Sequence, residues 1–207
     1  MSEQRLDAVV FDIGGVLLDW SPTYLYDELI PDPAEREHFL THIANGEWNK
    51  QQDAGRSWSE AVAELSSLHP EHAEWIEAYD TGWLKMAKGI IEDTAELVVE
   101  LRELGIPNYA LTNFSDEKWQ VAKAAFPILA GFDGEVVSGA EFTLKPEEKI
   151  YRILLDRFDL DPARTFYTDD VQLNVDGARA VGIIAERFTT ATTLRQQLVA
   201  HGLPLTS

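Results

Sequence analysis

The sequence contains no cysteine, so neither a disulfide framework nor a thiolate metal site is available to it. It also lacks a run of about 20 apolar residues that could span a bilayer. Its amino-terminal segment does not resemble a signal peptide. We therefore expect a cytoplasmic protein that does not act at a membrane.

Basic residues are scarce as well. The 17 lysines and arginines stand against 36 acidic residues, which gives a formal net charge of -19. Such a charge opposes binding to nucleic acid and to anionic membranes. It also repels phosphorylated molecules, so a site for a phosphate ester would need a cation and local hydrogen-bond donors.

The most informative stretch is residues 8–19, with the sequence AVVFDIGGVLLD. Its four leading apolar residues predict a strand that is buried on both faces, as in the middle of a parallel sheet. Asp12 ends this run, and a buried carboxylate needs either a partner or a chemical role. Gly14 and Gly15 then allow a ligand to approach the backbone closely. The alternative is a turn carboxylate without a catalytic role.

Residues 21–88 show helical periodicity only, and residues 89–207 return to alternating strands and helices. The clearest helix of the first segment starts after Ser57, where Glu60 completes a capping box. We expect helices at 23–29, 34–43, 58–68 and 72–79 in the first segment. In the second we expect strands at 108–111, 134–137, 165–168 and 183–185, and helices at 92–104, 116–126, 146–158, 174–181 and 193–200.

Polar residues follow three of these strands. Asp12 follows the first, Thr112 and Asn113 follow the second, and Asp169 and Asp170 follow the strand at 165–168. Strands joined by helices form parallel sheets with right-handed crossovers, so their carboxyl ends share one edge, where ligands bind. We expect these residues to meet there. An alternative for Thr112 and Asn113 is that they only cap the helix that follows.

These segments resemble the four motifs of the haloacid dehalogenase (HAD) superfamily, in order and spacing. The resemblance implies that Asp12 is the nucleophile, that Thr112 holds a phosphoryl oxygen with Asn113 beside it in the substrate site, and that Lys145, before Pro146, pairs with the nucleophile and the transferring group. The alternative for Lys145 is an exposed loop lysine.

The segment TFYTDDVQLNV, residues 165–175, resembles the fourth motif. Adjacent carboxylates at a buried strand end repel each other unless a cation lies among their oxygens, which favours Mg2+. The expected ligands are Asp12, the carbonyl of Gly14 and Asp170, with Asp169 binding through water and Asn174 steadying the acids. Acids that only cap the next helix are the alternative.

The resemblance implies an α/β fold: a Rossmann-like parallel sheet flanked by helices, residues 1–20 and 89–207, with an inserted helical cap, residues 21–88. It also implies a Mg2+-dependent phosphatase acting on a small phosphomonoester, such as a sugar phosphate, through an aspartyl phosphate. A phosphate-binding or regulatory protein with little turnover is the alternative. The oligomeric state is not predicted.

The sequence departs from the family pattern at Gly14, where the family usually has a second aspartate that acts as general acid and base. We expect water to replace this acid in part. A substrate hydroxyl, Asp19 or Asp53 are the alternatives. Four of the six tryptophans, Trp48, Trp58, Trp75 and Trp83, lie in the insert, with Trp20 at its entrance. We expect them to pack as its core, and the alternative is a sugar-binding lid. The five histidines are expected at the surface.

Overall fold

The computed structural model describes residues 6–205, and the outer ends of the expected core domain, residues 1–5 and 206–207, lie outside the described residues. Its centre is a five-stranded parallel sheet with the order β5-β4-β1-β6-β7. The strands are β1 (Ala8–Phe11), β4 (Asn108–Thr112), β5 (Gly134–Val137), β6 (Thr165–Asp169) and β7 (Ile184–Arg187). The prediction of a Rossmann-like parallel sheet is confirmed.

Strand β1 lies in the middle of this sheet. Val9 is opposite Asn108 of β4 on one side and Phe166 of β6 on the other. Every residue of β1 is at most 1% exposed. Both edges of the strand are hydrogen-bonded and both faces are covered, which explains why its apolar residues do not alternate with polar ones.

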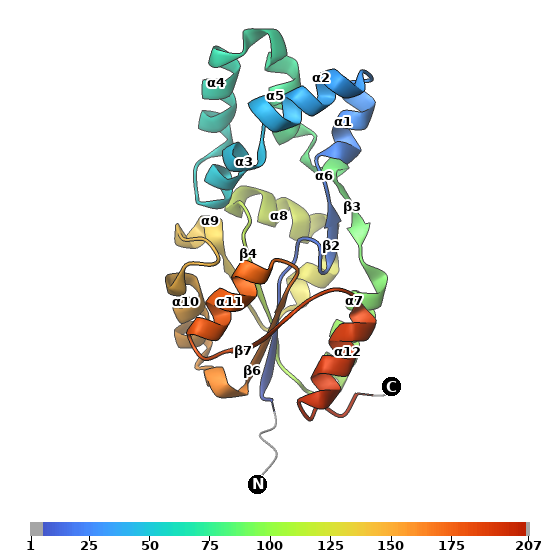
Figure 1. Ribbon diagram of the computed structural model, residues 1–207, viewed down its shortest axis with the longest axis vertical. Helices are drawn as coiled ribbons and strands as arrows, with labels where there is room; N and C mark the ends of the chain where they lie inside the picture. Colours follow the sequence, from blue (N-terminus) through green and yellow to red (C-terminus); the bar gives the residue numbers. More distant parts are fainter. Residues whose placement is uncertain (1–5, 206–207) are drawn as a thin grey trace.

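Helices cover both faces of the sheet (Figure 1). Val9 and Phe11 belong to one apolar cluster with α7 and α12, whereas Val10 belongs to another with α10 and α11. This alternation follows from the two-residue period of a strand. The helices after the insert are α7 (Glu92–Glu103), α8 (Asp116–Ala125), α9 (Ser138–Glu141), α10 (Glu148–Phe158), α11 (Gln172–Ala180) and α12 (Ala191–Ala200), with 3-10 turns at Pro127–Gly131 and Pro162–Arg164.

After β1 the chain forms a helical insert, which we define as residues 21–86. It stands on an antiparallel ribbon of β2 (Leu18–Trp20) and β3 (Ala87–Ile90), and the Ser21 N–H donates to the Met86 carbonyl across its base. The insert lies beyond the carboxyl ends of the sheet strands, at the top of Figure 1. Its helices are α1 (Thr23–Leu29), α2 (Pro33–His38), a π-helical turn (Phe39–Ile43), α3 (Gly46–Asp53), α4 (Trp58–Leu68), a 3-10 turn (Pro70–His72), α5 (Ala73–Thr81) and α6 (Trp83–Met86).

Aromatic side chains form the core of the insert. The Tyr79 ring lies 5.2 Å from Trp48, 5.7 Å from Trp58 and 5.9 Å from Tyr26, between ring centroids. Trp48 is 7% exposed and Trp58 is 1% exposed. Stacked, tilted and edge-to-face pairs of this kind add to the stabilisation from buried area. The expectation that tryptophans pack as the core of the insert is thus confirmed for these two.

The predicted start of α4 is also confirmed, because the Ser57 hydroxyl accepts from the Glu60 N–H at 3.3 Å. Three other expectations differ from the structure. The segment predicted as one helix at 34–43 is α2 followed by a π-helical turn. Helix α3 was not predicted, since the sequence GEWNKQQD carries almost no apolar periodicity. Pro146 does not begin a helix, because a turn from Leu144 to Glu147 delays the start of α10 to Glu148.

Within residues 6–205 there is no helix that is both long and apolar enough to cross a membrane. His72 departs from the expectation of surface histidines, since it is partly buried and stacks on Trp75 with the ring centroids 5.0 Å apart.

Candidate active site

Asp12 lies directly after β1, at the edge of the sheet that faces the insert. Its N–H donates to the Thr168 carbonyl at 3.0 Å, which extends the pairing of β1 with β6 by one residue. The residue is 7% exposed, and its Oδ1 accepts from the Ile13 N–H at 2.7 Å. These main-chain contacts fix the position of the carboxylate at the strand end.

Lys145 is the cation of this site. Its ammonium group lies 2.7 Å from Asp12 Oδ1 and 2.7 Å from Asp169 Oδ2, and it donates to the Leu111 carbonyl at 3.0 Å. An ammonium group has three N–H donors, so these three acceptors match its capacity. The residue is 3% exposed. The alternative of an exposed loop lysine is therefore wrong, although the catalytic role of Lys145 stays a prediction.

Asn113 holds the backbone of Lys145 in place. Its Oδ1 accepts from the Lys145 N–H at 2.8 Å, and its Nδ2 donates to the Lys145 carbonyl at 3.1 Å. The N-cap residue of α8 is Ser115, so the alternative that Asn113 only caps this helix is wrong. Thr112 is the last residue of β4 and is 1% exposed, at the same sheet edge. The predicted contacts of both residues with substrate remain untested.

Asp169 has more hydrogen-bond donors than the other two acids of the site. Besides Lys145, its carboxylate accepts from the Tyr167 hydroxyl, from the Val171 N–H at 2.8 Å and from Asn174 Nδ2 at 3.1 Å. Asn174 therefore steadies Asp169, as expected. The alternative that these acids only cap the next helix does not describe Asp169, whose oxygens also contact side chains from other elements.

The two glycines of the loop after Asp12 differ in their surroundings. Gly15 has a φ of +71°, and a Cβ built on it would lie 2.9 Å from Asp170 Oδ2. A side chain there would be both strained and in collision with the carboxylate. A Cβ on Gly14 would meet no atom of residues 6–205 within 4 Å. Gly15 thus allows the approach of Asp170, while Gly14 borders open space.

The carboxylates of Asp12, Asp169 and Asp170 form one cluster, in which a ligand oxygen from each lies within 4.8 Å of the others. Burial raises the pKa of Asp12 to about 7, with Asp169 adding to the rise and Lys145 opposing it. Burial, and then Asp169, also raise the pKa of Asp170. Burial acts to raise the pKa of Asp169 too, but Lys145 lowers it below its ordinary value.

This charge distribution fits a divalent cation. Lys145 contacts Asp12 and Asp169. The pKa of Asp170 is raised by burial and by Asp169, which indicates that nearby positive charge does not fully balance its negative charge. Mg2+ takes one or two carboxylates together with water and phosphate oxygens. The three clustered carboxylates supply oxygen ligands of this kind.

The order of these residues along the chain and their convergence at one sheet edge agree with a family comparison. The family of haloacid dehalogenase-like hydrolases matches residues 6–182. The chain belongs to this family. Membership of this family identifies the protein as a hydrolase. The resemblance to the HAD superfamily that was seen in the sequence is confirmed.

Several relatives of this HAD-like hydrolase are known. The sesquiterpene phosphatase astK of Aspergillus oryzae is 28% identical over 197 residues, which cover 91% of this chain and 95% of the relative. The HAD family enzyme BT-2542 of Bacteroides thetaiotaomicron is 22% identical, with a TM-score of 0.72, over 88% of this chain and 93% of that one. BT-2542 has also been crystallised with magnesium and inorganic phosphate.

Dehalogenases share the fold too. The L-2-haloacid dehalogenase of Xanthobacter autotrophicus is 18% identical, with a TM-score of 0.63, over 94% of this chain and 83% of that chain. At such identities the likeness to solved structures concerns the fold and does not distinguish one hydrolase chemistry from another.

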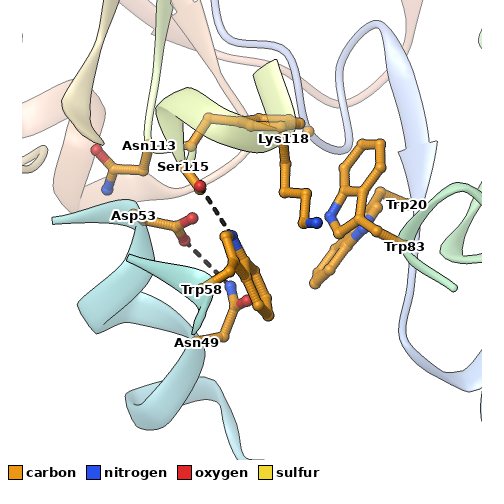
Figure 2. A pocket seen from close by; sticks show the side chains of 10 residues that line it. Trp20, Asn49, Asp53, Trp58, Trp83, Asn113, Ser115 and Lys118 are labelled. Atoms are coloured by element: carbon orange, nitrogen blue, oxygen red, sulfur yellow. Dashed lines mark hydrogen bonds between the residues drawn. The ribbon is translucent and has the colours of Figure 1, made fainter. Parts of the chain in front are cut away.

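A cavity of about 70 Å3 lies where the insert of the hydrolase meets the sheet edge. Figure 2 shows Asp53 and Trp58 from the insert facing Asn113 and Ser115 of the core. The Trp58 indole N–H donates to the Ser115 hydroxyl at 2.8 Å. The lining residues are Gly14, Trp20, Asn49, Asp53, Trp58, Trp83, Asn113, Phe114, Ser115 and Lys118.

Some residues of this region could not be identified from the sequence. Ser115 and Lys118 lie on the first turn of α8, and Lys118 donates to the Asp80 carboxylate and to the Asp80 carbonyl at 3.1 Å. Both residues link the core to the insert. No local pattern marks such contacts, because their partners are 38 or more residues away in the sequence. The role of Tyr167 as a donor to Asp169 was likewise hidden within an apolar strand.

Proposed function

We propose that the protein is a Mg2+-dependent phosphatase that hydrolyses a small phosphomonoester. The observation that carries this proposal is the cluster at the sheet edge: a buried Asp12 carboxylate 2.7 Å from the ammonium group of Lys145, with Asp169 and Asp170 beside it. A nucleophile, a buried cation and acids suited to a metal are the groups that phosphoryl transfer requires.

In this proposal the Asp12 carboxylate attacks the phosphorus in line with the leaving oxygen. The P–O bond to the leaving group breaks as an aspartyl phosphate forms, and water then hydrolyses that intermediate. The Thr112 hydroxyl contacts a phosphoryl oxygen, and Lys145 exchanges one of its three present acceptors for another. Both groups stabilise the charge that the phosphoryl oxygens carry in the transition state. Asn113 acts by holding the Lys145 backbone, and contacts substrate from the lining of the cavity.

Asp12, the carbonyl of Gly14 and Asp170 would hold Mg2+. The hydrogen bonds that occupy the oxygens of Asp169 favour binding through water for this residue. When bound, Mg2+ would shield the negative charge of the phosphate from the acids and orient it toward Asp12. The magnesium and phosphate found with BT-2542 support this assignment by analogy.

Dehalogenation is less compatible with the site. Dehalogenation does not use a metal held by acids, and without that metal the three clustered acids would repel the carboxylate of a 2-haloacid. Phosphoryl transfer with Mg2+ uses the same acids to hold the metal. The phosphatase among the relatives agrees with this choice.

We further propose that the insert, with the first two residues of β3, forms the cap domain expected at residues 21–88, and that its inner surface contacts the leaving group. Trp58 and Trp83 of the insert, together with Trp20 of β2 and Phe114 of the core, give the cavity an apolar lining. Such side chains can pack on a hydrocarbon group, as in the substrate class of the sesquiterpene phosphatase, or stack on a sugar.

Phosphate release from a panel of prenyl, aryl and sugar phosphates tests the proposal. We expect Mg2+-dependent turnover that is abolished by excess chelator and restored by added Mg2+, but not by Ca2+, which prefers more ligands at longer distances. Full activity in chelator would contradict the assignment of the metal ligands.

A second candidate is a phosphate-binding or regulatory protein with little turnover. The observation that favours it is Gly14, where the usual second acid is absent and the space is open. For this candidate the same panel would give binding, measured by calorimetry in Mg2+, without phosphate release. Turnover of any phosphomonoester well above the rate of the Asp12→Asn variant would exclude it.

A further inference from the structure

The open space at Gly14 belongs to the cavity between the insert and the core, and one acidic side chain lines this cavity from the opposite side. Gly14 and Asp53 are both lining residues. Asp53 is the last residue of α3, and the Ser138 hydroxyl of the core donates to its carbonyl at 2.5 Å. The backbone that carries this acid is therefore fixed to the end of β5.

The Asp53 carboxylate is held by two donors. Asn49 Nδ2 donates to it at 3.1 Å from the preceding turn of α3 (Figure 2). The Ser115 N–H donates to it from the start of α8. The first contact lies within the insert and the second comes from the core. The acid thus keeps one orientation as long as the insert rests on α8.

We propose that Asp53 supplies the general acid and base that the family usually carries at the position of Gly14. This inference rests on the proposed phosphatase function. In its closed position the insert would present the Asp53 carboxyl to the oxygen that leaves the phosphorus. The catalytic acid is thereby moved from the loop after β1 to the insert.

The protonation of Asp53 is suited to this role. Burial raises its pKa to about 7, and the Ser115 N–H opposes part of that rise. A general acid works best when its pKa is near the operating pH. Tyr79 from α5 interacts with Asp53, since its own pKa is raised by burial and then by Asp53. Lys118 from α8 lines the same cavity but is paired with Asp80, and Glu117 from α8 accepts from the Trp58 N–H.

The proton balance is as follows. In the first step the Asp12 carboxylate bonds to phosphorus, the P–O bond to the leaving group breaks, and the leaving oxygen takes the proton of Asp53. In the second step a water molecule gives a proton to the Asp53 carboxylate and bonds to phosphorus, while the bond between phosphorus and Asp12 breaks. The products are alcohol and phosphate, and both aspartates return to their initial states.

Asp19 is the other acid considered from the sequence, and its position is less suitable. It lies on β2, where its Oδ1 accepts from the Tyr24 hydroxyl at 2.8 Å. It is not among the residues that line the cavity, although its neighbour Trp20 is. Asp19→Asn is therefore a matched control for Asp53→Asn.

The first test measures single-turnover rates for phosphate esters of different leaving-group pKa. We expect a nearly flat dependence for the wild type and for Asp19→Asn. In Asp53→Asn, the rates for alkyl esters should fall by about 100-fold to 10,000-fold, as expected for loss of a general acid. Aryl esters with acidic leaving groups should lose much less, since they need little protonation.

A residue that only fixes the insert to the core would slow all esters equally. Glu117→Met measures such an effect, because Glu117 Oε1 accepts from the Trp58 N–H at 3.1 Å across the same interface and methionine removes this acceptor. Equal losses for alkyl and aryl esters in Asp53→Asn would overturn the proposal.

The second test is rescue. A Cβ at Gly14 meets open space, so Gly14→Asp can return an acid to the usual position. In the Asp53→Asn background we expect it to restore alkyl-ester hydrolysis by at least tenfold, whereas Gly14→Asn should not. Failure of this rescue in a folded protein that binds Mg2+ would count against the proposal.

If Asp53→Asn does not fold, the wild type still provides a test. The leaving-group dependence should steepen as the pH rises above about 7, where Asp53 loses its proton. A dependence that is the same at pH 6 and pH 9 would overturn the role of Asp53. Absence of phosphatase activity in the wild type would instead refute the proposed function, so the two failures are distinguishable.

Discussion

At the scale of single residues, the site is organised around Lys145. A buried ammonium group between Asp12 and Asp169 is stable only because both carboxylates are near it. Burial acts to lower the pKa of Lys145, but the charges of the two aspartates outweigh burial and raise it. The lysine therefore stays charged, and it also keeps Asp169 ionised at neutral pH.

The first residue-scale prediction concerns this pairing. Lys145→Met leaves two buried carboxylates without their cation, and we expect it to lower the free energy of unfolding by about 3–5 kcal/mol at neutral pH in chelator. Without the lysine, the pKa values of Asp12 and Asp169 should rise, so both carboxylates take up protons more readily as the pH falls. The loss of stability should therefore shrink at lower pH, because protonation removes the unpaired charges. Urea unfolding at several pH values measures both effects.

Lys123→Met is the matched control, since Lys123 forms a more exposed ion pair with Glu135 at 2.7 Å. Its cost should be about 0–1 kcal/mol. Equal losses for the two variants would mean that Lys145 contributes no more than a surface lysine.

The second residue-scale prediction concerns the nucleophile. Asp12→Asn keeps the shape of the side chain but replaces a carboxylate with a poor nucleophile. We expect phosphate release to fall to the uncatalysed background while the circular dichroism spectrum is unchanged. Wild-type rates in this variant would place the nucleophile elsewhere. The rate of this variant also serves as the background against which low turnover of the wild type is measured.

At the scale of elements, the loop after β1 determines how closely Asp170 approaches Asp12. Gly15→Ala would introduce a left-handed residue, at a cost of about 1–2 kcal/mol, and its Cβ would collide with Asp170. We expect weaker Mg2+ binding, seen as a higher Mg2+ concentration for half-maximal activity, together with the loss of stability.

Gly105→Ala separates the two effects. Gly105 has a similar φ of +70°, but a Cβ built on it meets no atom of residues 6–205 within 4 Å. It should lose comparable stability and keep the wild-type dependence on Mg2+. An unchanged Mg2+ requirement in Gly15→Ala would argue against Asp170 as a ligand.

The elements show how far sequence reasoning extends. Strands β1, β4 and β6 were predictable because their apolar residues run without interruption to a polar residue at the strand end. The ends of parallel strands then had to meet, which brought Asp12 and Asp169 together. The pattern of apolar and polar residues along each strand was sufficient to predict these strands and the meeting of their ends.

The ribbon of β2 and β3 and helix α3 were not predictable in the same way. The two strands have three and four residues, and their pairing joins positions about 70 residues apart. Helix α3 has few apolar residues because much of it faces solvent. Asp53 at its end could be named as an alternative, but its position in the same cavity as Gly14 depends on the packing of the insert against α8.

At the scale of the whole molecule, the net charge of -19 opposes the approach of a phosphomonoester, which is itself a dianion near neutral pH. Locally, Lys145 and a bound divalent cation would reverse this repulsion. The two fields have different ranges. Salt screens the interaction of the substrate with exposed charges that are farther away than the Debye length, which is about 8 Å at 0.15 M. Interactions between buried charges are screened much less.

This difference gives the last prediction. At saturating Mg2+, we expect kcat/KM to rise as ionic strength increases from about 0.01 M to 0.15 M, where the Debye length falls from about 30 Å to 8 Å. The reason is that screening weakens the long-range repulsion before it affects the buried site. The value of kcat at saturating substrate should change little, since it does not include the approach of the substrate. Measurements with a nonbinding salt such as potassium chloride, checked by matched Mg2+ titrations at each ionic strength, separate the two parameters. A kcat/KM that falls steadily with added salt would contradict this prediction, because it would mean that the substrate meets an attractive field on its approach. Local positive charge at the site, rather than the acidic surface, would then govern the rate of encounter.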